Sequence, residues 1–215
     1  MSRVIAIANL KGGCGKTTIA LNLACELNAK GAAVLIDADS QATASMWCEL
    51  GAMPIAHEKL PIDTAKGADR WIRKIKDLAQ AKEFLVIDCP PQIGTTTATA
   101  VGFADLVLVP VCASSADLTA TESAIALVNT ARTSRPDKGP VCLIVPSKID
   151  KRTSSGREIL EALKRFEERI SPTIYQRAAF VDSLGSGYWI GEYAPNGPAH
   201  QDIAALSAAV RKLLK

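Results

Sequence analysis

Short apolar runs alternate with longer amphipathic stretches along the chain. An apolar run of about 4–8 residues between turn-forming residues is typical of a buried strand. This pattern predicts five core strands and one short edge strand. The core strands are Val4–Ala8, Ala33–Ile36, Phe84–Ile87, Leu106–Val109 and Val141–Val145, and the edge strand is Glu58–Ile62.

Helices are predicted between these strands, where apolar residues recur every three or four positions. They cover Thr17–Lys30, Ala42–Leu50, Ala65–Ala81, Glu122–Ala131, Arg157–Ile170 and His200–Leu214. Strands that alternate with helices indicate a parallel sheet with helices on both faces. The sequence therefore predicts a three-layer α/β fold, in which a mostly parallel, twisted sheet is flanked by helices.

The composition is compatible with one domain. The 215 residues are 48% hydrophobic, which is enough to bury one sizeable core. We therefore expect a single domain over residues 1–215. No apolar run approaches the ~18 residues of a membrane span, and the first predicted strand leaves no room for a signal peptide.

The cysteines indicate a reducing compartment. None of the six belongs to a C-x-x-C pair or lies at metal-binding spacing from a histidine. Cysteines of this kind are usually reduced thiols in the cytosol. Cys14 lies in a glycine-rich segment, where we expect an ordinary loop residue; an oxidation-sensitive thiol is the alternative.

The net charge of +3 is unevenly distributed. Residues 138–215 carry 12 Lys and Arg against 8 Asp and Glu, whereas residues 1–137 are nearly balanced. A basic face can bind a polyanion, but an ordinary solvated surface explains so small an excess equally well.

A glycine-rich segment, K-G-G-C-G-K-T-T, joins the first predicted strand to the first predicted helix, from Lys11 to Thr18. Glycines let a backbone wrap with its N–H groups inward, and a helix N-terminus adds positive potential, so such a loop binds phosphate oxygens. In a phosphate-binding loop the Lys16 ammonium reaches the β- and γ-phosphates, and the Thr17 hydroxyl binds Mg²⁺. The candidate nucleotide-binding residues are Gly12, Gly13, Cys14, Gly15, Lys16, Thr17 and Thr18.

Acidic residues follow two other predicted strands. Asp88 follows Phe84–Ile87, and Asp37 and Asp39 follow Ala33–Ile36. In sheets of this type, ligands bind beyond the carboxyl ends of the strands. A carboxylate at a strand end can bind Mg²⁺, although it often only caps the next helix. Beside a phosphate-binding loop, the pattern favours the metal role for Asp88.

The glycine-rich segment departs from the standard phosphate-binding loop, because Leu10 replaces the first glycine and Lys11 adds a second lysine. In this form it resembles the deviant Walker A motif of the ParA/MinD family of ATPases. The resemblance implies ATP and Mg²⁺ as cofactors. It also implies hydrolysis of ATP to ADP and phosphate that is slow until a partner protein stimulates it.

The resemblance assigns roles to several residues. Lys11 matches the signature lysine, which reaches the ATP of a second subunit, so ATP binding is expected to produce a homodimer. Asp39 matches an aspartate that positions the attacking water and can also reach the metal through water, whereas Asp37 is expected to be structural. Asp88 and Thr17 are expected to hold Mg²⁺. The catalytic candidates are Lys11, Lys16 and Asp39.

Later segments extend the resemblance over nearly the whole chain. Asp150–Thr153, Gln176–Ser183 and Glu192–Pro195 are similar to the ParA C-terminal region. Because the chain starts at the strand before the loop, we expect no N-terminal helix-turn-helix domain, as in small ParA proteins. That type implies an ATP dimer that binds nucleoid DNA non-specifically in the cytoplasm. Together with a ParB-like partner or cargo adaptor, it positions a plasmid, a chromosome or a protein cargo.

Non-specific DNA binding needs Lys and Arg side chains that reach phosphates. Arg152 stands at the family's R-T position and is the first candidate. Lys164 and Arg165 could extend the patch. They lie with Arg157 on a predicted helix that also carries glutamates, so a salt-bridged solvent face is at least an equal interpretation for that helix. Phe180 stands where some relatives carry a DNA-contacting arginine, which leaves the location of the patch open. Further candidates are Lys148, Lys151 and Arg157, and alternatives near the C-terminus are Arg211, Lys212 and Lys215.

Two other functions share this loop. A MinD-like positioning ATPase needs a C-terminal amphipathic membrane anchor. The segment Ala208–Lys215 is short and has no Phe or Trp, so we expect no stable membrane association. Iron–sulfur reductases of this superfamily need two bridging cysteines, and Cys89 and Cys112 do not match their spacing.

Overall fold

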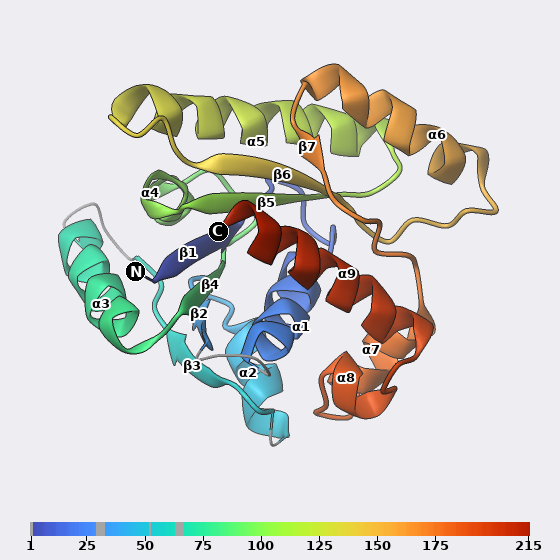
Figure 1. Ribbon diagram of the computed structural model, residues 1–215, viewed down its shortest axis with the longest axis horizontal. Helices are drawn as coiled ribbons and strands as arrows, with labels where there is room; N and C mark the ends of the chain where they lie inside the picture. Colours follow the sequence, from blue (N-terminus) through green and yellow to red (C-terminus); the bar gives the residue numbers. More distant parts are fainter. Residues whose placement is uncertain (1, 29–32, 52, 63–66) are drawn as a thin grey trace.

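The computed structural model describes residues 2–28, 33–51, 53–62 and 67–215. Within these residues the strands form one seven-stranded sheet in the order β3-β2-β4-β1-β5-β6-β7, and every strand pair is parallel (Figure 1). The predicted parallel α/β architecture is therefore confirmed. The strands are β1 Arg3–Ile7, β2 Ala33–Asp37, β3 Ala56–Lys59, β4 Phe84–Asp88, β5 Leu106–Val111, β6 Val141–Pro146 and β7 Arg169–Ile170.

Helices cover both faces of this sheet. Apolar residues of α1, α2, α7, α8 and α9 share one core with one sheet face, and those of α3, α4, α5 and α6 share a second core with the other. The helices are α1 Lys16–Asn28, α2 Thr43–Leu50, α3 Gly67–Ala81, α4 Thr95–Phe103, α5 Ser115–Ser134, α6 Ser154–Leu163, α7 Ala178–Gly185, α8 Ile190–Tyr193 and α9 Pro198–Leu213, with a 3-10 turn, η1, at Lys164–Phe166.

The central strands contribute to both cores. Side chains alternate across a strand, so Ile5 and Ile7 of β1 face the first core while Val4 and Ala6 face the second. A strand buried on both faces is apolar at every position. This is why the sequence shows unbroken apolar runs there.

Strand order places the acidic residues beside the glycine loop. Asp88 at the end of β4 pairs in register with Ile7 of β1 on one side and with Asp37 of β2 on the other. The loop after β1 and the two acidic strand ends therefore lie together at the carboxyl edge of the sheet.

The predicted helix Arg157–Ile170 is wrong at its C-terminal end. α6 ends at Leu163, η1 follows, and Glu167 takes a left-handed φ of 57° before β7. β7 pairs with β6, and Glu168 forms an ion pair with Arg132 of α5. These partners are distant in sequence, so the local periodicity does not reveal that the helix stops.

Other boundaries differ less. α5 extends beyond the predicted Glu122–Ala131, because the Ser114 side chain caps its N-terminus by accepting from the Asp117 N–H. α4, α7 and α8 lack a predicted counterpart, and β3 begins two residues before the predicted Glu58–Ile62. The predicted helix ends at residues 29–30 and 65–66 lie outside the described residues.

None of the helices in the described part of the chain is both long enough and apolar enough to cross a bilayer.

Candidate active site

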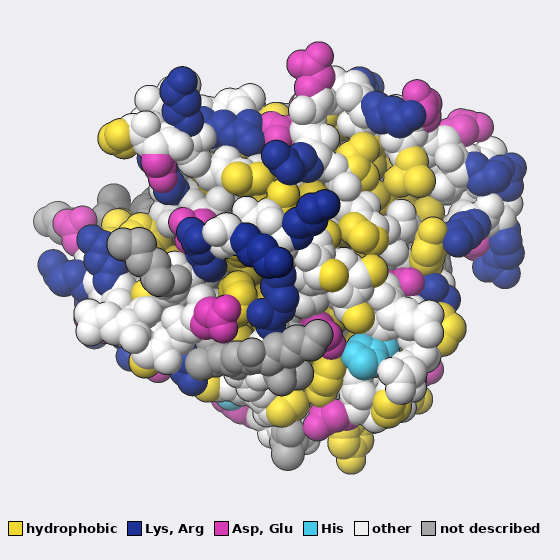
Figure 2. All heavy atoms as spheres, in the orientation of Figure 1, with side chains coloured by type: hydrophobic (Ala, Val, Ile, Leu, Met, Phe, Trp, Pro, Cys, Tyr) yellow, Lys and Arg dark blue, Asp and Glu magenta, His cyan; other side chains and the backbone are white. Residues whose placement is uncertain are grey.

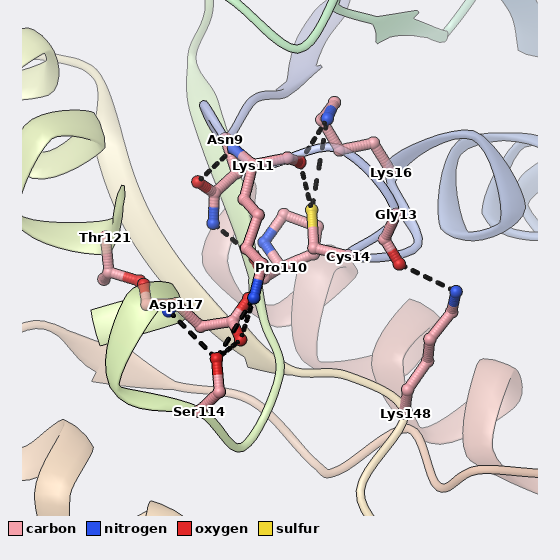
Figure 3. A network of polar contacts seen from close by, with 10 residues as sticks. All are labelled: Asn9, Lys11, Gly13, Cys14, Lys16, Pro110, Ser114, Asp117, Thr121 and Lys148. Atoms are coloured by element: carbon pink, nitrogen blue, oxygen red, sulfur yellow. Dashed lines mark hydrogen bonds and ion pairs between the residues drawn. The ribbon is translucent and has the colours of Figure 1, made fainter. Parts of the chain in front are cut away.

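The glycine-rich segment forms a loop between the end of β1 and the start of α1 (Figure 3). Gly13 and Gly15 adopt left-handed φ angles of 78° and 92°, which glycine reaches without steric cost. A Cβ atom at Gly15 would also lie 2.8 Å from Oγ of Ser147. Backbone conformation and packing therefore both require glycine at position 15.

The Lys16 side chain folds back over this loop. Its Nζ donates to the Lys11 carbonyl oxygen at 3.0 Å, and the residue is only 7% exposed. An ammonium group carries three donors. Lys16 can therefore exchange the carbonyl oxygen for phosphate oxygens of a nucleotide without leaving the loop.

Cys14 is buried within the loop. Its Sγ lies 3.2 Å from the Lys11 carbonyl oxygen. Desolvation raises the pKa of the thiol above its ordinary value, although the neighbouring Lys16 opposes the shift. A neutral thiol is a poor nucleophile, so this environment agrees with a packing role for Cys14.

The Lys11 side chain binds within its own chain. Its Nζ lies 2.6 Å from Oδ2 of Asp117 and 3.1 Å from Oγ of Ser114, as Figure 3 shows. Asp117 is 1% exposed, and its hydrogen bond raises the pKa of Lys11. The lysine matching the family's signature position is thus held by a buried carboxylate at the start of α5.

Asp117 is a site residue that the sequence analysis missed. It also accepts from the Ser114 hydroxyl, and its backbone N–H donates to that hydroxyl. The signal in the sequence is the Ser-x-x-Asp pattern that opens α5, which reads as an ordinary helix cap. Only the sheet order, which places β5 next to β1, brings this cap to the loop.

Lys148 lies at the loop and not on an outer basic surface. Its Nζ donates to the Gly13 carbonyl oxygen at 2.7 Å, and its backbone has a left-handed φ of 54°. Its neighbour Ser147 is buried against Gly15. The turn after β6 therefore supports the outer side of the glycine loop.

Asp88 lies at the end of β4 and is 1% exposed. Burial raises the pKa of its carboxyl to about 7, while the neighbouring Thr17 and Lys16 side chains oppose that shift. Its Oδ1 is buried without a hydrogen-bond partner in the part of the chain that the structure describes. A Mg²⁺ ion typically binds one or two protein oxygens and completes its coordination shell with phosphates and water. A carboxylate oxygen without a hydrogen-bond partner beside a threonine hydroxyl fits such an ion.

Asp37 and Asp39 differ in their surroundings. Asp37 is fully buried, and its Oδ2 accepts from both the backbone N–H and the hydroxyl of Ser45 in α2, at 2.8 and 2.9 Å. Asp39 lies in the turn after β2, where its Oδ1 accepts from the Gln41 N–H at 3.0 Å. Asp37 therefore fastens α2 to the sheet, while Asp39 stays at the accessible edge.

A cavity of about 640 Å³ adjoins the loop at Gly15 and Thr18. The turn after β6 and the segment before α7 form its polar side, and α2 and α7 form its apolar side. A pocket of this size, mostly apolar with a few polar groups, is typical of a small-molecule site. The sequence analysis assigned no binding role to Trp47, Gln176 or Arg177, which belong to this wall.

The remaining basic candidates lie together at the start of α6. Arg152 has 89% of its side chain exposed and pairs with Asp150, whose pKa it lowers to about 2. Lys151 lies over the Tyr175 ring, and Arg157 donates to the Arg152 carbonyl oxygen. The structure thus groups three of the four candidates and separates Lys148 from them.

Ion pairs occupy other basic residues near α6. Nζ of Lys164 lies 2.6 Å from Glu161, and Arg165 lies 2.7 Å from Glu122. The salt-bridged interpretation of these two side chains is therefore confirmed.

The family model described as "CobQ/CobB/MinD/ParA nucleotide binding domain" matches residues 5–188. The "Maintenance of carboxysome distribution protein A" of Halothiobacillus neapolitanus is 28% identical over 200 residues, covering 92% of this chain and 91% of that protein. The sporulation initiation inhibitor protein Soj of Bacillus subtilis is 26% identical over 218 residues, covering 82% of this chain and 85% of that protein.

Solved structures have the same fold at lower identity. Apo McdA from Cyanothece superposes with a TM-score of 0.80 at 18% identity over 100% of both chains. A variant of that McdA in complex with ATP gives 0.78 at 18% identity, covering 99% of this chain and 96% of that one. MinD of Pyrococcus horikoshii with Mg-ADP gives 0.80 at 17% identity, covering 100% and 98%.

The family match covers the loop, both acidic strand ends and the turn that carries Lys148. It agrees with the deviant lysine-bearing loop found at the sheet edge. The chain therefore belongs to the ParA/MinD family of nucleotide-binding domains.

Proposed function

We propose that this protein is an ATPase that binds ATP with Mg²⁺ at the loop between β1 and α1. The observation that carries the proposal is the orphaned Oδ1 of Asp88 beside the buried Lys16 ammonium and the left-handed glycines. A cation and a polyphosphate satisfy these groups together. The ATP complex of McdA and the Mg-ADP complex of MinD support the choice of nucleotide.

Each site residue has a defined task in this proposal. Lys16 gives up the Lys11 carbonyl oxygen and binds the β- and γ-phosphates. Asp88 releases its proton and, with Thr17, holds Mg²⁺, which neutralises developing phosphate charge when bound. Asp39, at the accessible edge, orients the attacking water.

This ATPase proposal is tested by phosphate release from ATP. Lys16→Ala should reduce the rate to background, because the triphosphate loses its cation. Lys164→Ala, which removes an exposed ion pair on η1, is the matched control and should keep the wild-type rate. A Lys16→Ala protein that still hydrolyses ATP at the wild-type rate would contradict the proposal.

We further propose that two copies join across bound ATP and that Lys11 of each copy reaches the phosphates of the other. A cation supplied in trans acts like an arginine finger. The Lys11 side chain is 36% exposed, so it has a path outward. The Lys11 side chain must first leave Asp117. Dimer formation is therefore coupled to the loss of the Lys11–Asp117 ion pair.

The ATP dimer is proposed to bind nucleoid DNA non-specifically and to position a cargo together with a stimulating partner. The name of one relative, which concerns the distribution of carboxysomes, supports a positioning role. The exposed Arg152 and its neighbours support a contact with DNA phosphates. A MinD-like membrane role has less support, because Val210 and Leu214 near the C-terminus pack into the core.

The DNA proposal is tested by binding to labelled duplexes of unrelated sequence, with a non-hydrolysable ATP analogue or with ADP. Only the ATP form should bind, with affinity that falls steeply as salt rises. Arg152→Ala should weaken binding to all duplexes alike and reduce the salt slope by about 1. Lys148→Met should instead weaken nucleotide binding, because the Gly13 carbonyl loses its partner.

Two outcomes would contradict this part of the proposal. Equal DNA binding with both nucleotides would rule out the nucleotide switch. An unchanged salt slope in Arg152→Ala would move the DNA surface elsewhere, with Arg211, Lys212 and Lys215 as the next variants.

A further inference from the structure

The segment that leads into α7 forms part of the polar wall of the cavity beside the glycine loop. Tyr175, Gln176 and Arg177 line the cavity there. Backbone hydrogen bonds tie this segment to the turn after β6: the Ile149 N–H donates to the Ile174 carbonyl oxygen at 3.2 Å, and the Gln176 N–H donates to the Ile149 carbonyl oxygen at 3.0 Å. One side of the wall is therefore fixed to the turn that also supports the glycine loop.

A single carboxylate of α9 holds the other side of this wall. Oδ2 of Asp202 accepts from the Tyr175 N–H at 3.1 Å and from Nε of Arg177 at 2.8 Å, and Oδ1 accepts from Nη2 of Arg177 at 3.1 Å. Asp202 is only 9% exposed and is not one of the described residues that line the cavity. It therefore contacts the wall without lining the cavity, and both of its oxygens lie on one edge of the guanidinium.

The positive partner of Asp202 comes from outside its own helix. Residues 198–210 contain no Lys or Arg. Figure 2 shows dark blue side chains gathered near the C-terminal end of α9, whose course is seen in Figure 1. A buried carboxylate without a partner is costly, so Arg177 supplies the charge that Asp202 needs.

The Arg177 guanidinium keeps donors for a ligand. An arginine has five N–H donors in a fixed, planar fork. Asp202 occupies Nε and Nη2, whereas Nη1 makes no hydrogen bond to any residue that the structure describes. The Cζ atom lies over the Tyr175 ring, 5.4 Å from the ring centroid, and the side chain is 29% exposed. The guanidinium is therefore held on one edge and one face, and its Nη1 donors remain available.

The ion pair also limits the charge that Arg177 presents to the cavity. The hydrogen bond from Asp202 raises the pKa of Arg177, which stays protonated. A guanidinium with a compensating carboxylate attracts a polyphosphate less than an unpaired ammonium does, because the two opposite charges nearly cancel at a distance. Its remaining N–H groups can still donate to an uncharged oxygen or nitrogen atom. This favours the nucleoside over the phosphates as the ligand of Arg177.

We propose that Asp202 is a positioning residue for the nucleotide. It holds Arg177 so that the Nη1 donors bind an acceptor atom of the nucleoside, while the phosphates lie in the glycine loop. The cavity adjoins that loop at Gly15 and Thr18, and its volume of about 640 Å³ suits a small-molecule ligand. The inference rests on the proposed binding of ATP and adds to it the residue that orients the cavity wall.

The test compares ligands with and without a nucleoside. Calorimetry with Mg²⁺ gives the dissociation constants of a non-hydrolysable ATP analogue and of inorganic tripolyphosphate. Asp202→Asn keeps the shape of the side chain but not its charge, so we expect the constant for the analogue to rise about tenfold or more. The constant for tripolyphosphate should change by less than about twofold, because the glycine loop is untouched.

Glu168→Gln is the matched control. Glu168 also binds an arginine, Arg132, with both carboxylate oxygens, and its side chain is 13% exposed. Neither Glu168 nor Arg132 is among the described residues that line the cavity. Both variants should lose stability in urea unfolding, whereas only Asp202→Asn should lose affinity for the ATP analogue. A loss of affinity in both would reflect general destabilisation and would contradict the inference.

A double-variant cycle tests whether Asp202 acts through Arg177. Arg177→Met should weaken binding of the analogue at least as much as Asp202→Asn does. Adding Asp202→Asn to Arg177→Met should then weaken it further by less than about twofold.

Steady-state phosphate release gives a readout that a merely structural role would not separate. Asp202→Asn should raise KM for ATP and leave kcat within about twofold, since Arg177 is proposed to contact the nucleoside and not the transferred phosphate. Arg177→Lys retains a cation for Asp202 but lacks the forked donors. It gives the same comparison between the ATP analogue and tripolyphosphate if Asp202→Asn does not fold.

Three further results would overturn the inference. They are an unchanged affinity for the ATP analogue in Asp202→Asn, an equal loss for the analogue and tripolyphosphate, and additive losses in the double variant. A wild-type protein that binds neither ligand would contradict the proposed ATPase itself, and the inference with it. That failure is recognised before any variant is made, so the two can be told apart.

Discussion

Asp88 and Asp117 are both 1% exposed, yet their surroundings differ. Asp117 faces the Lys11 ammonium, which offsets the cost of burying a carboxylate. Asp88 Oδ1 has no hydrogen-bond partner among the described residues, and burial raises the pKa of this carboxyl to about 7 although Thr17 and Lys16 oppose the shift. At the scale of single residues, one charge is therefore balanced within the chain, and the other is suited to a cation.

Asp88→Asn should change the pH dependence of stability. A folded-state pKa of about 7 lies above the ordinary 3.8, so the folded state keeps a proton that the unfolded state releases. The Asp88 carboxyl therefore contributes fully to the unfolding free energy below about pH 4. This contribution is lost as the pH rises toward 7. Without nucleotide, the variant should be more stable than wild type at high pH by roughly 1–4 kcal/mol, and equally stable near pH 4.

The measurement is urea unfolding across this pH range, repeated with Mg²⁺ and an ATP analogue. With those ligands wild type should be more stable than Asp88→Asn, because the amide cannot replace the carboxylate as a ligand of Mg²⁺. A variant that matches wild type at every pH would show that Asp88 titrates normally.

Lys11→Ala should separate activity from stability. It removes the cation proposed to act in trans, so phosphate release should fall by about 10³-fold or more. It also leaves the Asp117 carboxylate buried without its partner, which should cost about 1–3 kcal/mol of unfolding free energy. The double variant Lys11→Ala/Asp117→Asn should regain the stability, measured by urea unfolding, but not the activity. Recovery of turnover in the double variant would contradict the role of Lys11.

At the scale of elements, the site depends on contacts between segments distant in sequence. The turn after β6 supports the glycine loop through Ser147 and Lys148, and the start of α5 holds Lys11. The end of α2 meets the loop after α7 at Gly51 and Gly187. The walls of the cavity beside the glycine loop are therefore set by how these elements approach one another.

Gly51→Ala tests the contact between α2 and the loop after α7. The added methyl group would overlap the Gly187 backbone, so the elements must separate. We expect a loss of about 1–3 kcal/mol in unfolding free energy and weaker nucleotide binding. Gly102→Ala in α4 is the control, because a Cβ there meets nothing within 4 Å. It should stabilise the protein by about 0.5–1 kcal/mol, and a loss of stability like that of Gly51→Ala would refute the packing argument.

At the scale of the whole molecule, the proposal is that ATP joins two copies and that hydrolysis separates them. Asp39→Ala should keep ATP binding and remove the residue proposed to orient water, so the ATP dimer should persist. Light scattering after size-exclusion chromatography should give about twice the 22.7 kDa of the monomer with ATP and the monomer mass with ADP. A single copy in both states would contradict the proposed coupling between dimer formation and hydrolysis.

The sequence alone predicted the parallel α/β fold, the glycine loop and its acidic neighbours, because these depend on local patterns. Buried strands are continuous apolar runs, and the phosphate loop is a contiguous string with Lys16 and Thr17 at fixed spacing. The resemblance of the glycine-rich loop to that of the ParA/MinD family implied ATP as the nucleotide. The family match over residues 5–188 confirms the ParA/MinD relationship.

Only the tertiary structure decided which distant residues meet at that loop. The pairing of β5 with β1 brings Asp117 to Lys11, and the turn after β6 brings Lys148 to Gly13, away from the basic residues predicted beside it. The pairing of β7 with β6 likewise ends a helix that its own periodicity would continue. The physical reason is that local propensity and spacing act within a few residues, whereas ion pairs, strand pairs and helix contacts depend on the packed sheet.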